Sequence, residues 1–268
     1  MRTALFKTLI FSVVILSACL SYVAQTDGQI APPGKVFAGE TLKYEGKFNK
    51  LKISFSVAEL TFTSALAPNG TDLIINGEAA SKGTLVKIAR FSFLQQYQSV
   101  IDLNLFRILK TNKHDVQKDR VRDGEAIFDY GQKRVTYVET DPKDRNRPPR
   151  RIATEIGSEV QDITSSIYWL RLQTLAVGKR LEVAISDSGI VYKVPVAVTA
   201  REQINSIFGK VWCFRVEPEV FGTGQLIEQK GKMVIWVTDD ERRIPIRAQI
   251  TASVGKIDIK LKSATKAK

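Results

Sequence analysis

The stretch LEVAISDSGIVYKVPVAV, residues 181–198, decides the fold class. Apolar or aromatic residues occupy alternate positions from Leu181 to Ile185 and again from Ile190 to Val198. This period of two is typical of strands with one buried face. Ser188-Gly189 supplies a turn between the two runs. The segment therefore predicts an antiparallel hairpin.

Strand patterns continue on both sides of this hairpin. They lie at 42–48, 53–62, 73–80, 96–102, 106–114, 125–130, 134–140, 212–217, 233–237, 244–250 and 257–261. The run at 53–62 changes parity, so we expect a β-bulge between Val57 and Leu60 that keeps one face inward. MVIWV at 233–237 is apolar on both faces, which predicts a central strand covered on both sides.

One segment has helical spacing. In DITSSIYWLRL, residues 162–172, Ile163, Ile167 and Leu170 fall on one face behind Asp162, which suits an N-cap. TLVKIARFSFL, residues 84–94, fits either a second short helix or a bent strand.

These elements predict a mainly β protein. About eleven to thirteen strands are more than an open twisted sheet usually tolerates, so the sheet should curl. We predict one large curved antiparallel sheet, open or half-barrel, with one or two short helices. It forms a single domain over residues 36–264, followed by a basic tail at 265–268, and the loop at 141–150 interrupts it.

The N-terminus reads as an export signal. MRTALFKTLIFSVVILSAC, residues 1–19, has two basic residues before an apolar run that is too short to span a bilayer. Its end, Leu16-Ser17-Ala18-Cys19, resembles the bacterial lipobox, which implies a signal peptide at 1–18 and a lipidated Cys19. Alternatively, ordinary signal peptidase cuts after Ala24, although Tyr22 at the −3 position disfavours that site.

A lipidated Cys19 would anchor the protein to a membrane, because several acyl chains hold more firmly than one. Residues 19–35 contain Pro32-Pro33-Gly34 and no periodicity, so they would form a flexible leash. Leu20, and not Asp, follows the cysteine, which favours the periplasmic face of the outer membrane under the enterobacterial sorting rule. A soluble periplasmic protein is the alternative.

The chain is basic, with 40 Lys+Arg against 28 Asp+Glu and a net charge of +12. Loss of Arg2 and Lys7 with the signal leaves 38 against 28, a charge of +10. In the envelope this charge meets anionic lipids and polymers, and export excludes nucleic acid as a partner. Two clusters stand out. One contains Lys143, Arg145, Arg147, Arg150 and Arg151, and the other Lys256, Lys260, Lys262, Lys266 and Lys268. They read as a solvated loop and a solvated edge strand with a tail, or as contacts to an anionic surface.

Several segments resemble a known family. They are GETLKYEGKF at 39–48, DITSSIYWLRLQTLAVGK at 162–179, SDSGIVYKVPVAV at 186–198 and KGKMVIWVTDDERRIPIRAQI at 230–250. Together they resemble the bacterial envelope proteins grouped as domain of unknown function 3108, over about residues 36–264. The resemblance implies export and a mostly β fold, without an established activity. Where family members commonly have Asp-Pro-Leu-Ser, this chain has Asp162-Ile163-Thr164-Ser165. The expected architecture is also similar to the Lol-type lipoprotein carriers, whose half-open β-barrel with a helical plug holds acyl chains.

The sequence does not favour catalysis. His114 is the only histidine and lies in a polar stretch, which argues against a Ser/His/Asp hydrolase. The three consecutive acidic residues Asp239, Asp240 and Glu241 are typical of the turn of a hairpin. Cysteine and histidine do not cluster, so we expect no metal and no cofactor. Cys213 is expected to be a buried structural residue.

Large aromatic side chains are the more informative candidates. They can line the inside of the curled sheet as a ligand pocket, or simply pack in the core. The set is Phe91, Phe93, Tyr168, Trp169, Trp212, Phe214 and Trp236.

The leading hypothesis is a non-enzymatic envelope lipoprotein that binds an apolar or amphiphilic ligand, such as a lipid or acyl chain. The alternative is an interaction module without a cavity that docks to an anionic envelope partner through its basic loop and tail.

Overall fold

The computed structural model describes residues 33–50, 53–83, 92–253 and 255–266, all within the compact unit Pro32–Lys268. The fold is 65% strand, in one large sheet that does not close into a barrel. In the described ranges it has one α-helix and one 3-10 turn. The predicted fold class is confirmed.

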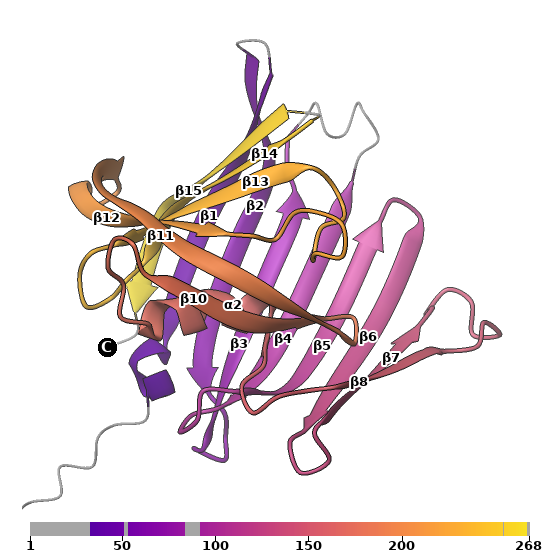
Figure 1. Ribbon diagram of the computed structural model, residues 1–268. Helices are drawn as coiled ribbons and strands as arrows, with labels where there is room; N and C mark the ends of the chain where they lie inside the picture. Colours follow the sequence, from indigo (N-terminus) through magenta and orange to yellow (C-terminus); the bar gives the residue numbers. More distant parts are fainter. Residues whose placement is uncertain (1–32, 51–52, 84–91, 254, 267–268) are drawn as a thin grey trace, which may run out of the picture. The chain divides into compact units, whose positions relative to one another are not determined.

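The described residues begin with a 3-10 turn and continue mostly as strand (Figure 1). The first half contains η1 (Pro33–Phe37), β1 (Glu40–Lys50), β2 (Ile53–Leu66), β3 (Asp72–Ser81), β4 (Phe93–Asp102), β5 (Ile108–Gln117), β6 (Arg120–Asp129), β7 (Arg134–Thr140) and β8 (Arg150–Glu155). The second half contains β9 (Gln161–Asp162), α2 (Ile163–Leu172), β10 (Arg180–Asp187), β11 (Ile190–Ser206), β12 (Gly209–Pro218), β13 (Gly231–Thr238), β14 (Pro245–Ala252) and β15 (Gly255–Lys266).

The strands form two meanders. Their order is β8-β7-β6-β5-β4-β3-β2-β1-β15-β14-β13-β12-β11-β10-β9, so the first and last strands of the chain pair at the centre. Every neighbouring pair is antiparallel except β9 and β10, which are parallel. The predicted antiparallel sheet is therefore confirmed, with this one parallel pair at its edge. The chain reaches β9 by crossing over from β8, not through a hairpin, and β9 leads directly into α2.

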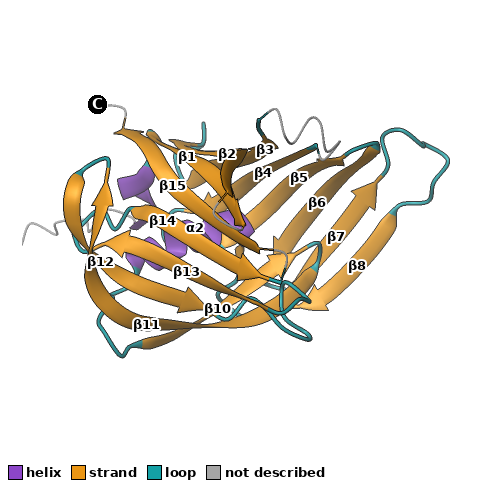
Figure 2. Ribbon diagram, turned by 90° about the horizontal axis from the view of Figure 1, so that it is seen from above, coloured by secondary structure: helices purple, strands orange, loops and turns teal. Residues whose placement is uncertain are grey.

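The topology forces the sheet to curl. Its two edge strands, β8 and β9, are separated in the chain only by residues 156–160. Strands lie about 4.8 Å apart, so the edges of a flat sheet of this width would be more than about 60 Å from each other. A linker of this length reaches roughly 20 Å at most. The β10–β14 side therefore folds back over β3–β8, with α2 between the two layers (Figure 2).

The turn between β10 and β11 packs against the opposite edge of the sheet. Gly189 has a φ of +81°, and a Cβ there would lie 2.5 Å from the Cβ of Tyr137 on β7. Its carbonyl accepts a hydrogen bond of 2.7 Å from Thr154 Oγ1 on β8. Glycine is required at this turn for both the left-handed backbone and the close approach.

Helix α2 is fixed at its N-terminus. Asp162 caps it, because its Oδ1 accepts from the Ser165 amide at 2.7 Å while Ser165 Oγ accepts from the Asp162 amide at 2.9 Å. The Oδ2 of Asp162 accepts from Ser99 Oγ on β4 at 2.5 Å and from Thr111 Oγ1 on β5 at 2.7 Å. The capping side chain thus also holds the helix on the sheet.

The C-terminal end of α2 is held by a buried ion pair. Arg171 binds Glu40 at the start of β1 through two bonds, Nη1 to Oε2 at 2.5 Å and Nη2 to Oε1 at 2.8 Å. Its guanidinium also lies 4.6 Å from the Phe37 ring centroid and donates to the Arg242 carbonyl at 3.1 Å. One side chain therefore connects η1, β1, α2 and the β13–β14 turn.

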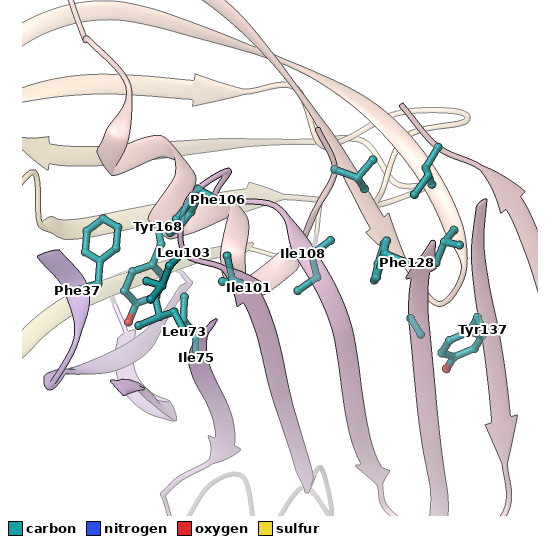
Figure 3. Close-up of a cluster of buried hydrophobic side chains, with 14 residues drawn as sticks. Phe37, Leu73, Ile75, Ile101, Leu103, Phe106, Ile108, Phe128, Tyr137 and Tyr168 are labelled. Carbon is teal, nitrogen blue, oxygen red and sulfur yellow. The ribbon is translucent and has the colours of Figure 1, made fainter. Parts of the chain in front are cut away.

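The buried apolar side chains form three clusters. In the first, Tyr168 of α2 is fully buried beside Phe37, at 5.1 Å between ring centroids, and the cluster extends from there over β3 to β7 (Figure 3). The second lies between α2 and β10–β13 and includes Leu170, Val183, Val194 and Val216. The third includes Leu42, Cys213, Trp236 and Leu261.

The structure refines several predicted elements. The bulge in β2 falls at Val57, since Gly46 pairs with Ala58 while Lys47 pairs with Ser56. As predicted, β13 is internal and covered on both faces, with Ile235 at the second cluster and Trp236 in the third.

Other predictions need correction. The strand carrying Lys256 to Lys266 is not an edge strand, because β15 pairs with both β1 and β14. β8 was not predicted, and it is the edge that carries Arg150 and Arg151. Pro33–Lys35, expected in the leash, form part of η1, and Thr265 and Lys266, expected in the tail, end β15. The segment 84–91, with its choice of helix or strand, lies outside the described residues, as do the signal and Cys19.

Candidate functional site

A cavity of about 580 Å³ lies between α2 and the inner face of the curled sheet. Its volume is within the usual range of small-molecule sites, about 300–1,000 Å³. Most of its walls are apolar. They include Leu60, Phe62, Ile163, Ile167, Trp169, Leu170, Val183, Ile185, Val194, Val196, Val216, Val220, Leu226, Ile227, Met233, Ile235, Ala248 and Ile259.

The alternating strands explain these walls. Val183 and Ile185 on β10 face the same side as Val194 and Val196 on β11, because the register pairs Val183 with Val194. Side chains two residues apart share a face of a sheet. The pattern that predicted the hairpin therefore also lines the cavity.

The connection between β12 and β13 contributes a further wall. Val220, Leu226 and Ile227 of this segment line the cavity. The segment is folded on itself, since Phe221 and Ile227 form an isolated β-bridge and the Ile227 amide donates to the Val220 carbonyl at 2.9 Å.

One end of the cavity is polar. Gln95 and Tyr97 on β4, Lys113 on β5 and Asp187 on β10 line it there. Lys113 Nζ donates to Asp187 Oδ1 at 3.1 Å and to Ser188 Oγ at 3.4 Å, and it lies 5.2 Å from the Tyr97 ring centroid. An apolar volume with a polar end matches the two parts of an amphiphile.

Lys113 is charged at neutral pH. Burial alone lowers its pKa, but the neighbouring Tyr97 and Asp187 outweigh burial and raise the pKa above its ordinary value of 10.5. Burial raises the pKa of Tyr97, so its hydroxyl stays protonated.

A small void of about 10 Å³ adjoins this polar end. Ser186, Tyr97, Lys113 and Asp187 are among its lining residues. Ser186 Oγ is buried and has no hydrogen-bond partner among the described residues. A void of this size accepts about one water-sized group.

Of the seven aromatic residues predicted for a pocket, Trp169 lines the cavity. Tyr168 is its neighbour in sequence but is fully buried in the first cluster. Residues adjacent on a helix point about 100° apart, which separates the two. Phe214 is buried in the second cluster but is not among the lining residues, and Phe93 on β4 is half-buried and also does not line it.

Two tryptophans lie elsewhere. Trp212 is 44% exposed and stacks with Arg201, whose guanidinium carbon is 4.3 Å from the ring centroid. Trp236 is buried in the third cluster, and its indole Nε1 donates to Glu202 Oε1 at 2.6 Å. For these two residues the pocket interpretation is wrong. Phe91 lies outside the described residues.

The cluster Lys143, Arg145, Arg147, Arg150 and Arg151 is exposed, in the β7–β8 loop and on β8. Its loop is held by the ion pair between Arg122 Nη1 and Asp141 Oδ2 at 2.5 Å. Arg147 reaches the same carboxylate at 3.7 Å, and Lys143 Nζ donates to the Asp119 carbonyl at 2.8 Å.

A second hollow, of about 950 Å³, lies mainly on the opposite face of the sheet and is more open to solvent. His114 lines it and pairs with Asp123 Oδ1 at 2.5 Å. Its amides bind one another across strands, with Gln98 Nε2 donating to Asn76 Oδ1 at 3.2 Å. These side chains satisfy one another's hydrogen-bonding groups, so we interpret the hollow as a solvent-exposed face of the sheet.

Cys213 lies in the core and the acidic run forms a turn, so both have structural roles. Cys213 is buried, and burial raises the pKa of its thiol to about 12, so it stays protonated. Asp240 lies in the β13–β14 turn, where it accepts from Thr238 Oγ1 at 2.7 Å and from the Arg243 amide at 3.0 Å.

Lys113 and Asp187 were not predicted as site residues. Each stands at an inward position of a strand whose pattern was recognised, and a charged residue on a buried face is a usable signal. Their partnership spans 74 residues of sequence, however, and no local pattern reveals it.

No helix within the described ranges combines the length and apolar character that crossing a membrane requires. The described residues contain no group of three or more His, Cys, Asp or Glu side chains arranged to hold a metal ion.

Comparisons with known proteins match the chain to one family and to one solved structure of similar fold. A family model described as "Protein of unknown function (DUF3108)" matches residues 43–262. No curated protein sequence matches the chain. Among solved structures, a β-barrel-like protein of domain of unknown function DUF1849 from Brucella abortus has a TM-score of 0.60 at 10% identity, covering 86% of this chain and 98% of that one. A Bacteroides fragilis protein with a YmcC-like fold has a TM-score of 0.34 at 9% identity, covering 85% and 96%.

Proposed function

The chain belongs to the DUF3108 family of proteins of unknown function, and we propose that it is an exported, non-enzymatic protein that binds an apolar or amphiphilic ligand. The site is the cavity between α2 and the curled sheet. The observation that carries the proposal is an apolar volume of about 580 Å³ with Lys113 and Asp187 at one end.

The apolar lining of the cavity supports an occupant. A ligand that covers this lining gains about 25 cal/mol for each Å² of apolar surface that it removes from water. Apolar walls are poor partners for water, which favours hydrocarbon as the occupant.

The polar residues at the cavity favour binding over catalysis. Ser166 Oγ donates to the Ile163 carbonyl at 2.8 Å, and Lys113 is paired with Asp187. A hydrolase needs a nucleophile next to a base. His114 lines the other hollow and is not among the residues of this cavity.

Export and anchoring are proposed from the N-terminal sequence. The lipobox-like Leu16–Cys19 supports a lipoprotein at the periplasmic face of the outer membrane. Replacing Cys19 by Ser should abolish incorporation of radiolabelled palmitate and release the protein into the soluble fraction. Unchanged labelling of the variant would exclude Cys19 as the lipidation site, and absence of labelling from the parent protein would favour the soluble periplasmic alternative.

The binding proposal is tested with N-phenyl-1-naphthylamine, an uncharged apolar fluorophore. The folded chain should enhance its fluorescence saturably with one site. Ala248 lines the cavity, so Ala248→Leu and Ala248→Phe should weaken binding progressively, the latter at least tenfold. Gln249→Phe, on the neighbouring position of β14, should leave binding unchanged.

Thermal unfolding of each variant checks that it is folded. If the enhancement is not saturable, or if the Ala248 variants bind as the parent does, the cavity is not the binding site and the proposal fails.

The exposed basic loop supports a second candidate function. Arg145 in the β7–β8 loop and Arg150 and Arg151 on β8 are exposed, and such a patch suits an anionic envelope polymer or membrane surface. This docking does not require the cavity. Charge reversal of Arg150 and Arg151 to Glu should abolish sedimentation with anionic vesicles without changing fluorophore binding.

A further inference from the structure

The polar end of the cavity contains balanced charge. Lys113 and Asp187 are 3.1 Å apart, with side chains 16% and 28% exposed. Each charge is therefore neutralised by the other before a ligand arrives. A ligand that brings a single net charge would be attracted by one member of the pair and repelled by the other.

The surrounding charges do not favour an anion. Asp162 is buried behind this end, on the inner side of β4 and β5, and is fixed by hydrogen bonds from Ser99 and Thr111. Asp115, on the same face of β5 as Lys113, is already paired with Arg120 at 2.6 Å. With Lys113 paired to Asp187, the remaining charge near the end is negative.

Hydrogen-bonding capacity remains for a head group that both donates and accepts. Both donors to Asp187, Lys113 Nζ and Ser188 Oγ, bind its Oδ1, so Oδ2 can accept from a ligand. Gln95 and Tyr97 add an amide and a hydroxyl.

The volume limits the hydrocarbon part. At about 30 Å³ per water-sized group, the cavity holds on the order of 20 such groups. A methylene group is of similar size, so the volume suits one acyl chain with the first atoms of its head group.

We propose that the ligand is a single-chain amphiphile whose head group has no net charge and carries both hydrogen-bond donors and acceptors. The chain lies along the apolar walls, and the head group binds at Lys113 and Asp187, beside Gln95 and Tyr97. This inference rests on the proposed binding function and adds the class of ligand.

The test is competition against bound N-phenyl-1-naphthylamine with four amphiphiles of equal chain length, each below its micelle concentration. They are monomyristoylglycerol, myristoyl-lysophosphatidylcholine, myristate and tetradecyltrimethylammonium. The uncharged and the zwitterionic compounds should displace the probe at concentrations at least tenfold lower than myristate. Comparing the first two distinguishes a hydroxyl head group from a zwitterionic one.

Two substitutions should change the preference of the site for the charge of the head group, in opposite directions. Asp187→Asn leaves Lys113 unpaired. It should lower the concentration at which myristate displaces the probe at least tenfold relative to that of monomyristoylglycerol. Lys113→Met leaves Asp187 unpaired and should improve the cationic amphiphile in the same way. Glu182→Gln removes a carboxylate from the other face of β10 and should change neither ratio.

The outcomes separate the two proposals. If the probe does not bind saturably, the binding function itself fails. If the probe binds but none of the amphiphiles displaces it, the binding function stands and the inferred ligand class is wrong. If myristate competes as well as monomyristoylglycerol, or if Asp187→Asn and Lys113→Met leave the ratios unchanged, the binding function stands and the inferred ligand class is wrong.

Discussion

At the scale of single residues, Arg171 joins four parts of the fold through its contacts with Glu40, Arg242 and Phe37. Its side chain is 2% exposed and bonds both oxygens of Glu40. Removing one partner of a buried pair leaves an uncompensated charge, which is far more costly than losing a surface pair.

We therefore predict that Arg171→Met lowers the free energy of unfolding by about 3–5 kcal/mol. The double substitution with Glu40→Leu should recover much of this loss, since no buried charge is then left unpaired. Urea denaturation measures both values. Arg201→Met, in the more exposed pair with Asp239, is the control and should cost about 0–1 kcal/mol. A loss of that small size for Arg171→Met would contradict the assigned role.

Asp240 gives a prediction on pH. Burial tends to raise the pKa of its carboxyl, but hydrogen bonds from Thr238, Arg242 and the Arg243 amide outweigh burial and hold the pKa below 3.8. A group with a lowered folded-state pKa stabilises the fold fully above its unfolded pKa and loses that contribution as the pH falls through the folded pKa. Stability should therefore decrease in acid as the pH falls below 3.8.

Asp240→Asn should make the melting temperature less dependent on pH in this acid range. Melting curves between pH 7 and pH 3 test it. An equally steep decrease in the variant would mean that other carboxylates, such as Glu217, whose pKa is also lowered, carry the effect.

At the scale of elements, α2 depends on Asp162 more than an exposed helix depends on its cap. The carboxylate serves the helix N-terminus through Ser165 and the sheet through Ser99 and Thr111. Its loss removes a cap and leaves two buried hydroxyls without their acceptor.

We predict that Asp162→Ala costs about 2–5 kcal/mol in unfolding free energy, where a cap alone accounts for about 0.5–2 kcal/mol. Asp162→Asn keeps a capping oxygen and should cost much less. Chemical denaturation of both variants gives the comparison. Equal costs for Ala and Asn would indicate that the negative charge, and not the hydrogen bonds, holds the helix.

The elements were predictable where side chains alternate regularly. The hairpin at 181–198, the bulge at Val57 and the cap at Asp162 follow from local spacing. β8 was not predicted because its sequence, RRIATE, has little apolar character. A strand at the edge of a sheet can remain exposed to solvent, so its sequence need not show an apolar face. The interior place of β15 depends on its pairing with β1 at the other end of the chain, which no local pattern encodes.

At the scale of the whole unit, strand count and the short link between β8 and β9 explain why the sheet curls, and curling creates the cavity. A pocket could be predicted from the sequence, but its walls could not. The helix turns Trp169 toward the cavity and Tyr168 into the first cluster, and the polar end joins β5 to β10 across the fold.

Quenching of tryptophan fluorescence by monomyristoylglycerol brominated along its chain tests the central claim most directly. We predict saturable quenching in the parent protein, because Trp169 lines the cavity while Trp212 and Trp236 do not. The saturable component should disappear in Trp169→Phe and persist in Trp212→Phe. Saturable quenching that survives in Trp169→Phe, or its absence from the parent protein, would contradict a ligand site between the helix and the sheet.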